Sequence, residues 1–101
     1  MVESIQHKAI VQCIKDKYGG KLEGRCNGFC DLSHPSGNIE VEFGGRDRII
    51  YSAFKLFTSS GKSWLVVPKK RLKLAKEICQ HFPSVHVVTP EEICDNWKDY
   101  L

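Results

Sequence analysis

Two periodicities of apolar residues divide the chain into helices and strands. In residues 2–18 the apolar side chains recur at the 3.6-residue spacing of an amphipathic helix, and Gly19 and Gly20 end it. In residues 38–43 apolar and polar residues alternate, with Glu40 and Glu42 on the polar face, as expected for a half-buried strand. The chain is therefore predicted to begin with a helix and continue into a sheet.

Turn signals connect this strand to two others. Residues 21–26 and 29–34 flank Asn27 and Gly28, the dipeptide most typical of a tight hairpin. A second turn, at residues 35–37, leads into the strand at residues 38–43. The three strands are predicted to form an antiparallel meander.

The rest of the chain alternates helices with strands. The pattern predicts a helix at residues 49–57, a strand at 63–67, a helix at 69–82, a strand at 85–88 and a last helix from residue 90. Thr89, Pro90 and Glu92 supply an N-cap, a first-turn proline and a capping-box acid for the last helix. The order α-β-β-β-α-β-α-β-α predicts an α/β fold with a mixed sheet flanked by helices.

Composition limits the chain to one ordinary globular unit. At 101 residues, with 42% hydrophobic and 27% charged residues, we expect a single domain over residues 1–101. No apolar run approaches the roughly 20 residues that cross a bilayer, and the amino terminus lacks the continuous apolar stretch of a signal peptide. These features predict a soluble, cytoplasmic protein that does not bind a membrane.

The cysteines show no recognisable metal or redox spacing. There are five, and none forms a CxxC pair. Cys26, Cys30 and His34 recur every four residues, but they fall in the predicted hairpin and not on a helix. We therefore expect buried thiols, with a disulfide as the alternative in a hyperthermophile protein.

Three carboxylates in the predicted meander are the candidates for chemistry. If residue 34 pairs with residue 39, Asp31 lies opposite Glu42, and Glu40 projects from the same face. Three carboxylates together repel one another unless they are solvated or bind cations, and Mg²⁺ or Mn²⁺ would suit such oxygen ligands. The alternative is an ordinary solvent-exposed sheet face, on which alternating glutamates are common.

The element order and these acids resemble the PD-(D/E)xK, or restriction-endonuclease-like, nuclease superfamily. The similarity covers roughly residues 1–67. The superfamily includes the small archaeal Holliday junction resolvases. In FCDLSH, Asp31 matches the family's metal-binding aspartate, and in NIEVEF, Glu40 matches its second acid. The resemblance implies a Mg²⁺- or Mn²⁺-dependent nuclease that hydrolyses DNA phosphodiester bonds, with Asp31 and Glu40 as metal ligands.

One position departs from the family pattern. Glu42 stands where the family has a lysine, so a general-base or ligand role is expected for Glu42, and Arg46 is a candidate for the missing positive charge. Glu3 matches the first-helix acid of many members. The alternatives are a solvated Arg46 at a helix start and a Glu3 that merely favours a first helical turn.

The remaining signals concern partners. Five basic residues on the helix at 69–82 are candidates for binding DNA phosphates, unless they form only its solvated face: Lys69, Lys70, Arg71, Lys73 and Lys76. The segment at residues 60–63 lacks the glycine and the element order of a phosphate-binding loop, so no nucleotide cofactor is expected.

Oligomeric state and activity each leave two readings open. A homodimer through Ile93, Trp97 and Leu101 is the resolvase-like expectation, and closure of the monomer's own core is its alternative. For function, the alternative to a nuclease is a non-catalytic nucleic-acid-binding or interaction domain on the same fold.

Overall fold

The computed structural model describes residues 4–22, 25–26, 28–59 and 61–101. Its centre is a mixed, open sheet of five strands in the order β1-β4-β5-β6-β7. The strands are β1 (Lys21–Leu22), β4 (Leu32–His34), β5 (Gly37–Val41), β6 (Ser63–Val66) and β7 (Val85–Val88). β1, β4 and β5 pair antiparallel, whereas β5, β6 and β7 run parallel. The predicted α/β class with a mixed sheet is confirmed.

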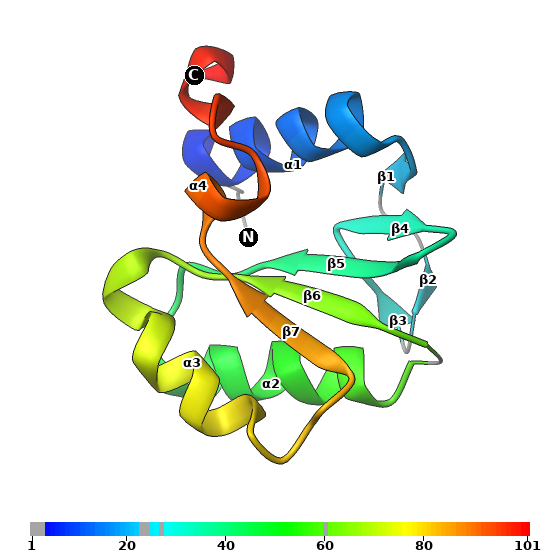
Figure 1. Ribbon diagram of the computed structural model, residues 1–101, viewed down its shortest axis with the longest axis vertical. Helices are drawn as coiled ribbons and strands as arrows, with labels where there is room; N and C mark the ends of the chain where they lie inside the picture. The colour runs from blue at the N-terminus through cyan, green and yellow to red at the C-terminus, as the bar shows by residue number, and fades with distance from the viewer. Residues whose placement is uncertain (1–3, 23–24, 27, 60) are drawn as a thin grey trace.

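Helices cover both faces of this sheet (Figure 1). One face carries α1 (Ile5–Tyr18), the short α4 (Pro90–Ile93) and the 3-10 turn η2 (Trp97–Tyr100). The other face carries α2 (Arg46–Phe57) and α3 (Leu72–Cys79), which the 3-10 turn η1 (Lys69–Arg71) precedes. Each crossover between parallel strands therefore packs on the side of α2 and α3.

Two predicted elements are interrupted. The first hairpin keeps one register, but it divides between β1 with β4 and a separate two-stranded ribbon of β2 (Arg25–Cys26) and β3 (Gly28–Phe29). The last helix stops at Ile93, since Cys94 takes an extended conformation with φ −154° and ψ 89°. The predicted capping box of Thr89 and Glu92 is present at its start.

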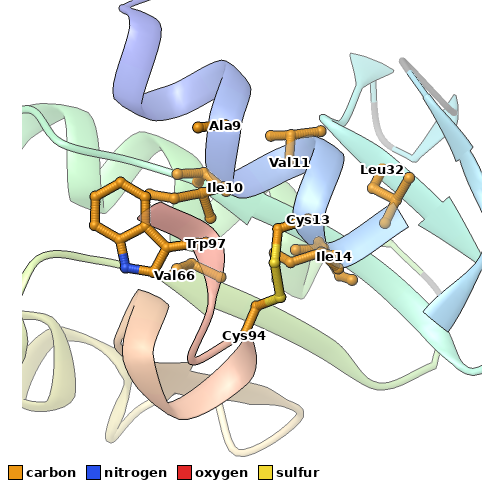
Figure 2. Packing of buried hydrophobic residues seen from close by; sticks show 11 residues of the cluster. Ala9, Ile10, Val11, Cys13, Ile14, Leu32, Val66, Cys94 and Trp97 are labelled. Atoms are coloured by element: carbon orange, nitrogen blue, oxygen red, sulfur yellow. A yellow bond between two sulfur atoms is a disulfide. The ribbon is translucent and has the colours of Figure 1, made fainter. Parts of the chain in front are cut away.

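Apolar side chains fill both sides of the sheet. The cluster under α2 and α3 includes four fully buried side chains: Ile49, Ala53, Leu56 and Leu65. On the opposite face, Figure 2 shows α1 and the C-terminal segment packed together around Trp97, which is only 6% exposed. The last helical segment thus closes the core of the monomer, and the surface predicted for a homodimer is not available at Trp97.

A disulfide joins Cys13 of α1 to Cys94, with the two Cα atoms 6.5 Å apart (Figure 2). The expectation of free thiols is therefore wrong for this pair. It failed because α1 and the segment after α4 meet only in the folded sheet, 81 residues apart in sequence. Cys30 and Cys79 are buried, as predicted.

Across the described parts of the chain, no helix has both the length and the apolar character needed to span a membrane.

Candidate functional site

The turn before β5 sets the position of Asp31. Leu32 pairs with Ile39 and His34 with Gly37, so the predicted pairing of residues 34 and 39 is wrong by two positions. Gly37 belongs to the strand and not to the turn. Its backbone has φ +146° and lies against Lys62 O and Trp64, which leave no room for a Cβ atom. The ladder therefore continues toward Asp31 opposite Glu40, not Glu42.

Asp31 lies just before β4, where the backbone bends away from β5. Its Oδ2 accepts a hydrogen bond from the Val41 N–H at 2.7 Å, which satisfies a strand-edge donor that β4 no longer reaches. The same oxygen is 3.2 Å from Nε2 of His7, on α1. The carboxylate is thus held between the edge of β5 and the first helix.

Glu40 lies next to Asp31, and its side chain points toward α2. It is 6% exposed, and its Oε1 forms an ion pair with Nζ of Lys55 at 2.5 Å. Lys55 is itself mostly covered, with 16% of its side chain exposed. An acid and a base from two adjoining elements are therefore buried together beside Asp31.

The pKa values of the two carboxyl groups are shifted in opposite directions. Burial and the neighbouring charge of Asp31 raise the pKa of Glu40 to about 8, against the opposing effect of Lys55. Burial would also raise the pKa of Asp31, but the hydrogen bonds from His7 and from the Val41 N–H outweigh it and hold that pKa below its ordinary value. At neutral pH a proton shared by the pair resides mainly on Glu40.

Glu42 has partners of a different kind. One carboxylate oxygen accepts from the Gly44 N–H at 2.8 Å and lies 3.3 Å from Arg48 Nε. The other accepts from Ser52 Oγ at 3.1 Å. These contacts fasten the loop after β5 to the first turns of α2. The role predicted for Glu42 in catalysis remains a prediction.

Lys55 and His7 are the site residues that sequence reasoning missed. A signal existed for Lys55, because Arg48, Ser52 and Lys55 follow the i, i+4, i+7 spacing of one helical stripe. A polar stripe on the helix after a strand with two glutamates indicates contact between them. His7 lacked such a signal, since its contact with Asp31 depends on where α1 crosses the sheet edge.

The other predicted site residues lie around this cluster. Arg46 is the exposed first residue of α2, and Glu3 lies outside the described residues. The basic residues follow the carboxyl end of β6; all but the half-buried Arg71 are exposed: Lys69, Lys70, Arg71, Lys73 and Lys76. Because β5 and β6 are parallel, Arg46 and Lys69 follow strand ends at the same edge of the sheet.

The donor set restricts which metal would suit the site. No group of three or more His, Cys, Asp or Glu side chains placed to hold a metal occurs within the described ranges. Mg²⁺ is commonly bound by only one or two protein carboxylates, with water and substrate phosphates as the other ligands. Asp31 and Glu40 are two such carboxylates, and the predicted Mg²⁺ or Mn²⁺ site stays a prediction.

Comparison with protein-family models, with curated proteins and with solved structures gave no match to this chain.

Proposed function

We propose that this protein is a Mg²⁺- or Mn²⁺-dependent nuclease that hydrolyses DNA phosphodiester bonds, on a restriction-endonuclease-like fold. The observation that carries the proposal is the placement of Asp31 beside Glu40, with Lys55 on Glu40 and His7 on Asp31. Two acids and a lysine converge there although no single sequence motif contains all three. Glu42 stands at the strand position where the family has a lysine. Lys55, from α2, would supply that positive charge instead.

The acids fit a divalent cation on the chemistry of the pair itself. Burial and, after it, the charge of Asp31 raise the pKa of Glu40 to about 8, and a cation bound by both carboxylates would relieve their repulsion. Asp31 and Glu40 would hold the ion. When bound, the ion would supply Lewis-acid stabilisation of a phosphate and a lower pKa for water.

The chain's own groups have distinct parts in the proposed reaction. His7 and the Val41 N–H fix Oδ2 of Asp31, and the same carboxylate lies next to Glu40. The Lys55 ammonium, once displaced from Glu40, is placed to offset negative charge that develops on a phosphate at the site. Arg46, Lys69 and Lys70 follow strand ends at the same edge of the sheet and would bind the nucleic-acid backbone.

A non-catalytic nucleic-acid-binding domain is the second candidate. Glu40 is nearly inaccessible and in contact with Lys55, so an ion must displace the Lys55 ammonium to bind. If it cannot, the same residues form a buried polar contact that anchors α2 to β5. A homodimer and a cytoplasmic location remain predictions in both cases.

Metal binding and cleavage distinguish the two candidates. We expect calorimetry to show about one Mn²⁺ bound per chain, in line with a two-carboxylate site. Linear, single-stranded and four-way-junction DNA should be cut in Mg²⁺ or Mn²⁺ and remain intact with a chelator. DNA binding without stoichiometric metal binding or cleavage would favour the non-catalytic domain.

A further inference from the structure

The outer side of α2 exposes aromatic rings that the core does not use. Tyr51 is 68% exposed and Phe54 is 55% exposed, three residues further along the helix. Phe57 differs, because its ring packs on Phe82 of the α3 side at 4.6 Å between centroids. Tyr51 and Phe54 are therefore large apolar groups that face solvent.

Tyr51 is also connected to the candidate site. Nζ of Lys55 lies 5.6 Å from the centre of the Tyr51 ring, and the same ammonium pairs with Glu40. The two residues are four apart on the helix, the spacing at which side chains meet. A ring that is mostly exposed thus lies one side chain away from the buried carboxylates.

The charge carried by this helix is mostly positive. Arg46, Arg48 and Lys55 outnumber its one acid, Asp47. Arg48 also pairs with Glu42, and Lys55 also pairs with Glu40. Arg46 is exposed, and the side chain of Arg48 is 54% exposed. An aromatic surface among cations suits a strand that offers both base faces and phosphates.

We propose that Tyr51, with Phe54 beside it, stacks on an unpaired base, so that the substrate class of the site is single-stranded or locally unpaired nucleic acid. The inference rests on the proposed function, since it names the substrate of the same site. Base stacking on an aromatic ring needs a free base face, which a closed duplex does not offer. The Lys55 contact places that base next to the carboxylates.

The test measures binding without metal, so it does not depend on cleavage. Fluorescence anisotropy in a chelator compares parent and Tyr51→Leu on labelled oligo-dT, oligo-U and a duplex of equal length. We expect Tyr51→Leu to weaken binding to at least one single strand by about 5- to 100-fold and to leave duplex binding within about twofold. Tyr51→Phe should retain the parental affinity. The dT and U arms show whether the stacked strand is DNA or RNA.

Tyr18→Leu is the matched control. Tyr18 is also an exposed tyrosine with a lysine ammonium over its ring, at 5.4 Å from Lys17, but it lies at the end of α1 on the opposite face of the sheet. Its loss should leave single-strand binding unchanged.

Four results would overturn the inference. The parent could fail to bind single strands, or Tyr51→Leu could bind them as tightly as the parent. Tyr51→Leu could weaken strand and duplex binding equally, or it could convert a parental dimer to a monomer in sedimentation. The last would assign the surface to a second copy of the chain. Selective strand binding without metal-dependent cleavage would retain the inference about Tyr51 while removing the nuclease proposal.

Discussion

Lys55, which lies on a neighbouring element, affects the pKa of Glu40. The acid comes from β5 and the base from α2, so their pairing depends on how the helix packs on the strand. Sequence reasoning selected Asp31 and Glu40 from alternation and turn signals, which are local. It missed Lys55 and His7 because their partners lie 15 and 24 residues away in sequence.

Glu40 gives a prediction for stability against pH. Its pKa is about 8 in the folded protein against 4.5 as the ordinary value, so the folded state retains a proton that the unfolded state releases. The contribution of Glu40 to the free energy of unfolding is therefore full below about pH 4.5 and declines as pH rises toward 8. Asp31, whose pKa is lowered, changes the free energy of unfolding only below this pH range.

Glu40→Gln should remove that decline. Urea unfolding between pH 5 and 8 should give the parent a falling free energy of unfolding and the variant a flatter one. The exposed Glu77→Gln, on α3, controls for the loss of one acid. Parallel slopes in parent and Glu40→Gln would show that the proton on Glu40 does not contribute.

At the scale of elements, the predictions that proved wrong depended on contacts between segments distant in sequence. The strand at residues 85–88 is confirmed to the residue, since it is a short apolar run between clear breaks. The predicted hairpin register was wrong because Gly37 belongs to β5, where its backbone lies close to Lys62 of a different segment. The residues of the turn alone do not predict that contact.

The link between α1 and the C-terminal segment gives the second prediction. Closing a chain segment of this length with a disulfide typically contributes about 2–5 kcal/mol, mainly by restricting the unfolded state. Reduction of Cys13–Cys94 should therefore lower Tm by at least about 8 °C, measured by circular dichroism with and without a thiol reductant. Cys94→Ser should show no reductant-dependent shift.

Cys79→Ala is the control for this measurement, because Cys79 is a buried free thiol. Its Tm should still fall on reduction, whatever the substitution itself does to stability. A parent whose Tm ignores the reductant would contradict a structural role for the disulfide.

At the scale of the whole molecule, the sheet gathers charge at one edge. Asp31 precedes the antiparallel β4, while Arg46 and Lys69 follow β5 and β6, so all three lie toward the carboxyl ends of the parallel strands. The predicted order of helices and strands was sufficient to expect this arrangement. The side-chain contacts within it required the register and the crossing of the helices.

The basic segment gives a third prediction. Replacing Lys69, Lys70 and Lys73 together by Ala should weaken DNA binding evenly across sequences and reduce the salt dependence by about one unit of log–log slope per lost phosphate contact. Titrations at several salt concentrations measure both effects.

A matched triple variant separates position from net charge. Lys8 and Lys17 of α1 and Lys98 of η2 are also exposed, on elements of the opposite face. Their replacement by Ala should leave the slope nearer to the parental value. Equal losses in the two triples would show that binding follows total charge and not the edge near Asp31.

The proposed role of Asp31 is tested most directly by Asp31→Asn, assayed for cleavage and for binding on one preparation. The amide keeps an oxygen to accept the Val41 N–H, so circular dichroism should show an intact fold. Cleavage in Mg²⁺ or Mn²⁺ should fall at least ~10²-fold, while metal-free DNA binding should be at least as tight, because a repelling charge is removed. The exposed Asp95→Asn should cleave like the parent. Parental cleavage by Asp31→Asn, with unchanged metal dependence, would contradict the proposed metal site.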